Sequence, residues 1–219
     1  MSKEKQFAVI GLGRFGRSIA RHLHTMGYEV LAVDRSYELV QSFSDEVTHV
    51  VQADTTDENA LKALGIRNFD VVIVAIGEDM QANVLTVVQL KELGVPYVVA
   101  KARNLLHGKL LEKIGADSIV YPERDMAKRV AYSLTSRNIM DYIELSPEYS
   151  IAEVGVPKSI AGKSLIESNV RAKYGLNVVA IKRNDKLILP PNPHDVIEKD
   201  DIIVVVGSNE GMKRWEDLK

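Results

Sequence analysis

The stretch FAVIGLGRFGRSIARHLHTMGYEVLAVD, residues 7–34, decides the fold of this chain. An apolar, β-branched run leads directly into a glycine-rich turn, and apolar residues at helical spacing follow it. Gly11 allows the tight turn out of the strand, Gly13 lets backbone N–H groups approach a phosphate, and Gly16 lets the helix pack closely on the sheet. A second apolar strand delivers Asp34, where a carboxylate can accept hydrogen bonds from two ribose hydroxyls. The stretch therefore predicts a phosphate-binding βαβ unit whose helix N-terminus faces the anion.

Two alternatives stay open for this stretch. The glycines could simply end a strand while Asp34 caps the helix that begins near Tyr37. Arg35 could pair with the 2′-phosphate of NADP, but Asp34 in front of it would repel that phosphate. We therefore expect an adenosine nucleotide with a free 2′-hydroxyl.

Composition excludes several classes of function. The 219 residues include 28 basic and 30 acidic side chains, which gives no reason to expect nucleic-acid binding or adhesion to an anionic membrane. The absence of cysteine excludes disulfides, thiolate catalysis and cysteine metal sites. The longest apolar runs, Val71–Ile76 and Ile202–Val206, are too short to cross a bilayer. We expect a cytoplasmic protein without direct membrane insertion.

Strands and helices continue to alternate after residue 34. We expect strands near 48–52, 70–77, 96–101 and 118–121, and helices near 37–44, 58–64, 80–93, 105–114 and 122–135. With the two strands of the opening stretch, this pattern predicts a Rossmann-like, doubly wound parallel sheet of the α/β class. Residues 70–77 read as its clearest buried strand, and Gly77 lies at the carboxyl end, where ligands bind in open α/β sheets.

The polar segment after the third strand has two interpretations. Asp57 or Thr56 can cap the helix at 58–64. Asp54 lies just before that cap, where its side chain could reach an adenine edge or could serve only the turn. Both roles of Asp54 stay open.

The helix at 122–135 needs a partner because the predicted sheet is complete without it. One apolar face is formed by Met126, Val130, Ala131 and Leu134, and it could pack on a second subunit or on the C-terminal part of this chain. We interpret it as a dimerising crossover helix.

A second, smaller α/β module follows. We expect strands near 140–145, 150–156, 177–182, 186–189 and 202–207, and a closing helix near 210–218. We set the domains at 1–145 and 146–219. The second is too small to be very stable alone, which favours dimerisation.

Catalytic groups are not recognisable from spacing. The five histidines show no metal-ligand spacing and are expected at the surface. No nucleophile, base and orienting group can be assembled from the sequence. A nucleotide site without a reaction centre favours a sensor, and an NAD-dependent oxidoreductase remains the alternative.

Several sequence blocks resemble one known family. FAVIGLGRFG, VVIVAIGED, KIGADSIVYPERDMA, AGKSLIESNVRAKYGLNVVAIKR and DDIIVVVGS are similar to KtrA/TrkA-type regulators of potassium uptake, the RCK family. The resemblance runs essentially from end to end. It implies an N-terminal RCK domain, a C-terminal RCK_C domain, and dimers that assemble into an octameric ring. The ring would dock on a membrane potassium-transporting subunit of the KtrB/TrkH type, at the inner face of the cell membrane.

The resemblance also implies ligands and residues. ATP and ADP would compete for the N-terminal site, NAD(H) could bind there, and the RCK_C dimer would bind cyclic di-AMP. Glu123 would hold Mg²⁺ or Ca²⁺ near the phosphates. The second-messenger pocket would be lined by Leu165, Val170, Arg171, Asn177 and Pro193. The nucleotide site would be lined by Gly11, Gly13, Arg14, Phe15, Gly16, Asp34, Arg35, Asp54, Thr55, Ala75, Ile76, Gly77 and Lys101.

Overall fold

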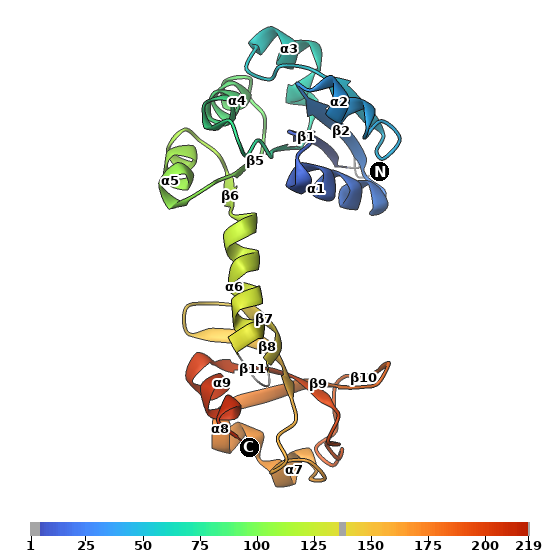
Figure 1. The fold of residues 1–219 in the computed structure, drawn as a ribbon, viewed down its shortest axis with the longest axis vertical. Coiled ribbons are helices and arrows are strands. Elements are labelled where there is room, and N and C mark those ends of the chain that lie inside the picture. Colours follow the sequence, from blue (N-terminus) through green and yellow to red (C-terminus); the bar gives the residue numbers. More distant parts are fainter. Residues whose placement is uncertain (1–4, 136–138, 219) are drawn as a thin grey trace. The chain divides into compact units, whose positions relative to one another are not determined.

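The computed structural model describes residues 5–135 and 139–218 and divides the chain into two compact units, residues 1–122 and 123–219 (Figure 1). Helix α6 (Pro122–Thr135) falls almost wholly within the second unit. Its Tyr132 ring stacks on Tyr142 with the ring centres 4.4 Å apart, and Arg129 pairs with Asp141 at 2.8 Å. The boundary between the two units therefore lies at the start of α6, directly after Pro122, while the domain division at residue 145 stays a prediction.

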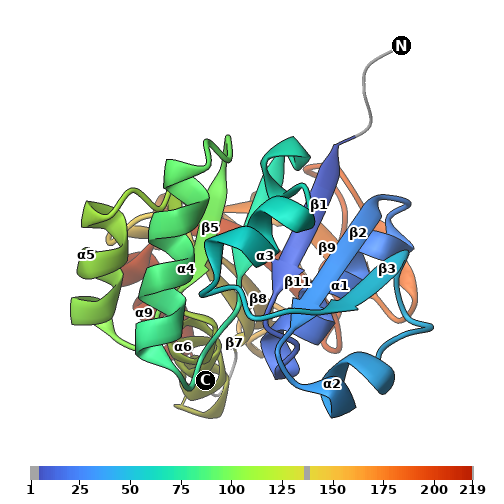
Figure 2. The same cartoon turned by 90° about the horizontal axis from the view of Figure 1, so that it is seen from above.

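The first unit contains a six-stranded, wholly parallel sheet. Its strands are β1 (Gln6–Ile10), β2 (Glu29–Asp34), β3 (His49–Gln52), β4 (Val71–Val74), β5 (Val98–Lys101) and β6 (Ser118–Val120). Their spatial order is β3-β2-β1-β4-β5-β6, and Figure 2 shows β1, β2 and β3 side by side. The order reverses between β1 and β4, which is where ligands bind in such sheets. The predicted doubly wound sheet is confirmed.

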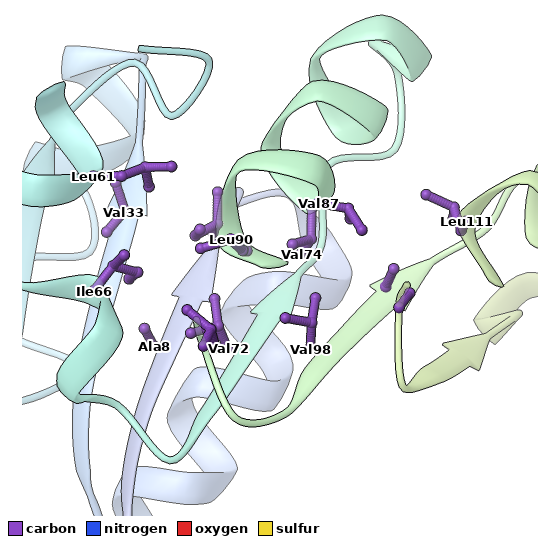
Figure 3. Close-up of a cluster of buried hydrophobic side chains, with 14 of the residues drawn as sticks. Ala8, Val33, Leu61, Ile66, Val72, Val74, Val87, Leu90, Val98 and Leu111 are labelled. Carbon is purple, nitrogen blue, oxygen red and sulfur yellow. The ribbon is translucent and has the colours of Figure 1, made fainter. Parts of the chain in front are cut away.

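Helices cover both faces because alternate strand residues point to opposite sides. Helices α1 (Arg14–Thr25) and α2 (Tyr37–Gln41) share one core cluster with Val9 of β1. Helices α3 (Glu58–Ala63), α4 (Met80–Glu92) and α5 (Leu105–Lys113), with the 3₁₀ turn η1 (Ile66–Asn68), share the other. Figure 3 shows this second cluster, in which Leu61, Leu90 and Leu111 pack against the strands.

Side-chain caps start four of these helices. Ser36, Asp57, Asp79 and Asn104 each accept a hydrogen bond from a first-turn N–H group. The predicted cap by Asp57 is confirmed, with its Oδ1 2.9 Å from the Asn59 nitrogen. Such caps satisfy N–H groups that have no partner within the helix.

One predicted surface histidine is buried. His107 is 3% exposed because it shares the inward face of α5 with Gly108 and Leu111. Burial, and then the charge of Arg103, lower the pKa of His107. The surface prediction was wrong for this residue.

The second unit is an antiparallel sheet with short helices. Its strands are β7 (Ile139–Glu144), β8 (Tyr149–Gly155), β9 (Leu176–Arg183), β10 (Lys186–Ile188) and β11 (Ile202–Ser208), in the order β10-β9-β11-β8-β7. Helices α7 (Leu165–Ser168), α8 (Val170–Tyr174) and α9 (Asn209–Glu216) complete it. Trp215 of α9 is fully buried and donates its indole N–H to the Gly155 carbonyl at 3.2 Å.

Candidate functional sites

The glycine turn after β1 packs directly on the end of β4. Gly11 has φ +96°, and a Cβ added to it would lie 3.0 Å from the Ile76 nitrogen. A Cβ on Gly16 would lie 1.8 Å from the Gly11 carbonyl oxygen and 3.2 Å from the Ala75 Cβ. Only glycine fits either position. At Gly13, by contrast, an added Cβ would meet no heavy atom of the described residues within 4 Å, which leaves room for a phosphate beside the turn.

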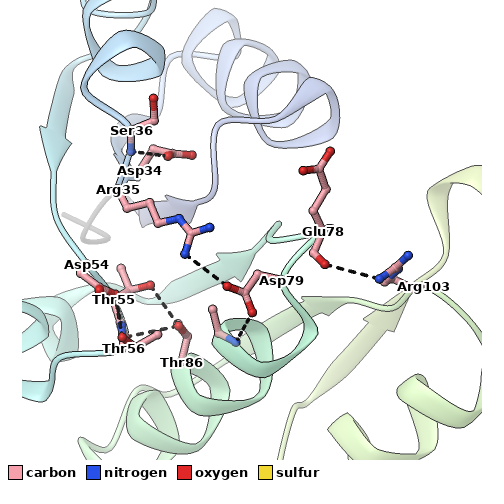
Figure 4. Close-up of polar contacts among 11 residues, drawn as sticks. Asp34, Arg35, Ser36, Asp54, Thr55, Thr56, Glu78, Asp79, Thr86 and Arg103 are labelled. Atoms are coloured by element: carbon pink, nitrogen blue, oxygen red, sulfur yellow. Dashed lines mark hydrogen bonds and ion pairs between the residues drawn. The ribbon is translucent and has the colours of Figure 1, made fainter.

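Asp34 stands at the end of β2 and faces this turn. Its Oδ2 accepts a hydrogen bond from the Leu12 N–H at 2.6 Å. Its Oδ1 accepts one from the Ser36 N–H at 2.8 Å, and Figure 4 shows this second bond. A carboxylate offers about four acceptor positions, so the two bonds leave capacity for ribose hydroxyls. The half-buried acid therefore fits the predicted role.

Arg35 is paired across the same edge of the sheet. Figure 4 shows its guanidinium paired with the Asp79 carboxylate, and the two groups lie 3.2 Å apart. Asp79 also caps α4, and its bond from the Ala82 N–H, followed by its contact with Arg35, lowers the pKa of this carboxyl. The pairing places a second carboxylate beside the arginine that a 2′-phosphate would need, which supports the preference for a free 2′-hydroxyl.

The polar side chains after β3 form hydrogen bonds within their own part of the chain and with α4. Asp54 accepts hydrogen bonds from the Thr56 N–H at 2.9 Å and the Thr56 hydroxyl at 2.7 Å, and these bonds lower the pKa of Asp54. The hydroxyl of Thr55 is buried, 3.0 Å from the Thr86 hydroxyl (Figure 4). The Thr55 side chain thus points into the interior, and the adenine contact of the exposed Asp54 stays a prediction.

Cationic side chains lie at the carboxyl edge of β5 and at the start of α1. The Lys101 ammonium lies 5.8 Å from the centre of the Phe15 ring. A Cβ added to Gly77 would lie 3.3 Å from this ammonium nitrogen. Arg14 is the exposed first residue of α1. The structure thus gathers the glycine turn, Asp34 and Lys101 at one edge of the sheet.

Glu123 belongs to the second unit. It lies exposed in the first turn of α6, where an acid is favourable at the positive end of the helix. Among residues 5–135 and 139–218, no group of three or more His, Asp or Glu side chains could hold a metal ion. A metal at Glu123 would need other ligands, such as phosphate oxygens, and this role stays a prediction.

A pocket of about 510 Å³ opens in the second unit. It brings together all five residues predicted to line a second-messenger site, Leu165, Val170, Arg171, Asn177 and Pro193. Five further lining residues were missed, Ile166, Asn169, Leu176, Val178 and Pro191. Apolar walls with one arginine suit a ligand that combines flat rings with phosphate.

Backbone hydrogen bonds close one side of this pocket. The Ile166 N–H donates to the Pro193 carbonyl at 2.9 Å, and the Leu165 N–H donates to the Asp195 carbonyl at 3.0 Å. The segment that carries the prolines is thereby tied to α7. Helices α7 and α8 were not predicted, although Ser164 and Glu167 form a capping box that could have indicated the first of them.

Two family models match the chain in succession. The TrkA-N domain matches residues 7–122, and the TrkA-C domain matches residues 150–218. Ktr system potassium uptake protein A of Bacillus subtilis (strain 168) is 51% identical over 214 residues, which cover 98% of this chain and 96% of that protein. Ktr system potassium uptake protein C of the same strain is 51% identical over 213 residues, with 97% and 96% covered.

Solved structures share the fold. The GsuK RCK domain superposes with a TM-score of 0.69 at 22% identity, covering 99% of this chain and 48% of that one. The GsuK channel bound to NAD gives a TM-score of 0.70 at 20% identity, with 99% and 40% covered. A GsuK structure bound to ADP matches 61% of this chain and 35% of its own, with a TM-score of 0.54 at 18% identity.

Proposed function

The chain belongs to the Ktr/Trk family of potassium uptake proteins, whose TrkA-N and TrkA-C domains it carries in order, and from this membership we propose that it is the nucleotide-responsive regulatory subunit of a potassium uptake system. The observation that carries the nucleotide part is the Asp34 carboxylate, bonded to the Leu12 N–H beside the open Gly13. On this proposal, the carboxylate would accept the ribose hydroxyls and the turn would cradle the phosphates on one edge of the sheet. The two B. subtilis relatives are named as potassium uptake proteins, which disfavours the oxidoreductase alternative.

Adenosine nucleotides are the proposed ligands of the first unit. ATP and ADP would place their phosphates at the glycine turn and their ribose at Asp34, and NAD(H) would use the same groups. The NAD-bound and ADP-bound structures of GsuK, which share this fold, support these ligands. We assign the phosphate contacts to the turn N–H groups, Arg14 and Lys101. Glu123 would bind Mg²⁺ or Ca²⁺ only when nucleotide phosphates supply further oxygens.

Cyclic di-AMP is the proposed ligand of the pocket in the second unit. Its phosphates would pair with Arg171, and its adenines would lie on the apolar walls formed by Leu165, Val170 and Pro193. Because the ligand has two-fold symmetry, a dimer that presents the same pocket twice would bind it with two arginines.

The proposed assembly is a dimer that builds an octameric ring on a membrane potassium-transporting subunit. Every residue of α6 from Glu123 to Leu134 is exposed, although Met126, Val130 and Leu134 are apolar. A second copy of α6 would cover this face. Within the described residues, no helix is both long and apolar enough to cross a bilayer. Contact with the cytoplasmic face of the membrane would therefore come through the transporting subunit.

A thermal-shift screen of the full chain tests the proposal. ATP, ADP, NAD(H), NADP(H) and cyclic dinucleotides are added singly, each to the parent, to Asp34→Ala and to Arg171→Ala. A ligand that binds only the folded state adds about 2.7 kcal/mol at 100 times its dissociation constant. ADP should stabilise the parent and Arg171→Ala, and cyclic di-AMP the parent and Asp34→Ala. A parent stabilised by neither would refute the proposed function.

A further inference from the structure

Helix α4 ties the loops at the nucleotide edge of the sheet together. Asn83, Thr86 and Gln89 follow one another at intervals of three residues along one side of the helix. Gln89 donates to the Thr56 carbonyl at 2.7 Å, and Thr86 donates to the Thr55 carbonyl at 3.3 Å. These two side chains hold the loop after β3.

Asn83 holds the ends of the two strands beyond it. Its Nδ2 donates to the Ile76 carbonyl at 2.7 Å and to the Lys101 carbonyl at 3.2 Å, so both amide hydrogens are used. A flipped amide would face two carbonyl oxygens with its own oxygen, so the hydrogen bonds fix the orientation. The side chain is 0% exposed.

This arrangement leaves the Oδ1 atom of Asn83 buried without a hydrogen-bond partner among the described residues. Leaving a buried acceptor unpaired costs free energy that an apolar side chain of similar volume, such as leucine, would not cost. Native proteins keep few such atoms, and those they keep often mark functional positions. The two donated bonds are thus better explained by what they position than by stability.

The two residues that Asn83 joins meet at the phosphate end of the site. Ile76 packs against Gly11 and directly precedes Gly77. Lys101 sends its ammonium group back over Gly77, within 3.3 Å of where a Cβ would stand. The spacing between the ends of β4 and β5 therefore decides where this positive charge lies relative to the glycine turn.

We propose that Asn83 is a positioning residue that sets the Lys101 ammonium against the nucleotide phosphates without touching the ligand. The inference rests on the proposed nucleotide binding by the first unit. Because a charge-assisted hydrogen bond depends on both distance and direction, loss of the two hydrogen bonds that Asn83 donates weakens phosphate recognition specifically. Recognition of adenosine itself, which lacks a phosphate, is preserved.

The test compares ADP with adenosine on the full chain. Dissociation constants come from titration calorimetry, with adenosine measured by its displacement of ADP. Asn83→Leu should weaken ADP binding roughly tenfold, the value of one charge-assisted bond, and leave adenosine within about twofold. Asn83→Ala is measured alongside, so that a leucine variant that fails to fold does not end the test.

Gln89→Leu is the matched control. It also removes a side-chain bond to a loop carbonyl, and Gln89 Oε1 is likewise buried without a partner among the described residues. It should leave the ratio of ADP to adenosine affinity unchanged. Lys101→Met should weaken ADP on its own, and Asn83→Leu added to it should cause less than about a twofold further loss, because residues that act through one another are not additive.

The outcomes separate the two claims. A folded Asn83 variant that binds ADP as the parent does, or that loses ADP and adenosine equally, overturns the positioning role alone. A tenfold further loss of ADP affinity when Asn83→Leu is added to Lys101→Met also overturns the positioning role alone. A parent that binds neither compound overturns the proposed function, and this inference with it.

Discussion

The Asp34 carboxylate accepts a hydrogen bond from the Leu12 N–H at 2.6 Å, which joins the end of β2 to the middle of the glycine turn. The acid therefore helps to shape the glycine turn, the proposed phosphate cradle, and stands where we propose the ribose to lie. A nucleotide that engaged the carboxylate would also act on the turn, so the proposed ribose and phosphate contacts are coupled through this hydrogen bond.

Asp34→Ala should weaken ATP, ADP and NAD together, because all three share the adenosine ribose. A hydrogen bond to a charged group is worth ~1.5–3 kcal/mol, so affinity should fall by roughly one to two powers of ten in calorimetry. Glu38→Ala, an exposed change in the next helix, is the control and should bind normally. Unchanged affinity for all three ligands in Asp34→Ala would show that the ribose assignment is wrong.

Asp79→Asn should relax discrimination against a 2′-phosphate. Asparagine keeps the cap on α4 but releases Arg35 from its carboxylate partner. Binding of adenosine 2′,5′-bisphosphate relative to 5′-AMP should improve by up to about fivefold, since an exposed ion pair is worth ~0.2–1 kcal/mol. The double variant with Arg35→Ala should lose this gain. An unchanged ratio in Asp79→Asn argues against any influence of the pair on selectivity.

Glu123→Gln should abolish the effect of Mg²⁺ or Ca²⁺ on ATP affinity. Phosphate and carboxylate are both anions, and a cation between them removes their repulsion. Titrations with ATP in the presence of each cation or of chelator measure the effect. Asp125→Asn, in the same helical turn, is the control, and it removes an acid that pairs with Arg124 at 2.8 Å. Equal cation dependence in parent and Glu123→Gln would refute the role.

Arg171→Ala should remove cyclic di-AMP binding and leave ATP binding intact, because the pocket lies in the second unit. Arg171→Lys should recover binding only in part, since lysine cannot form a bidentate pair with phosphate. Lys173→Ala, on the same helix but outside the pocket lining, is the control. Calorimetry with cyclic di-AMP decides, and full affinity in Arg171→Ala would rule this site out.

Asp201→Asn should lower the free energy of unfolding at pH 7 and make that free energy less dependent on pH at acid pH. Burial alone would raise the pKa of Asp201, but hydrogen bonds from Arg183 and the Glu198 N–H outweigh it and hold the pKa below its ordinary value. A carboxyl with a depressed pKa adds stability above the unfolded pKa of about 3.9 and loses it as pH falls further.

Thermal melts of both chains between pH 7 and pH 2 measure the effect. At pH 7 the loss should be about 1.5–3 kcal/mol, the value of hydrogen bonds to a charged group. The difference should shrink below about pH 4, where the carboxyl of the unfolded parent chain begins to bind protons, and should vanish as the pH falls through the lower pKa of the folded state. Asp200→Asn, at the exposed neighbouring position, should follow the parent curve, and a constant difference at every pH would contradict the assignment.

Most of the predictions that the structure confirms came from local patterns in the sequence. The glycine turn, the alternation of strands and helices, and the Asp57 cap depend on neighbours within a few residues, and the structure has all of them. The predicted strand at 70–77 instead ends at Val74, and the residues that follow it pack against Gly11. Contacts between residues so distant in sequence are not visible in a local pattern.

The features that the sequence did not predict have several causes. Helices α7 and α8 contain four and five residues, too few for a helical period to be recognised. The burial of His107 depends on which face of α5 meets the sheet. Asn83 could not be singled out because both of its partners are backbone carbonyls. The pocket residues were predicted through a family resemblance, since they come from separate parts of the chain.

If α6 pairs with a second copy as we propose, its helical order depends on the protein concentration. An isolated helix of this length is marginal in water, and every residue from Glu123 to Leu134 stays exposed within this chain. The predicted pairing with a second copy would supply the missing burial. Dilution should then unwind α6 while both sheets stay folded. The amide-exchange rate of α6 would therefore report the fraction of chains that are paired with a second copy.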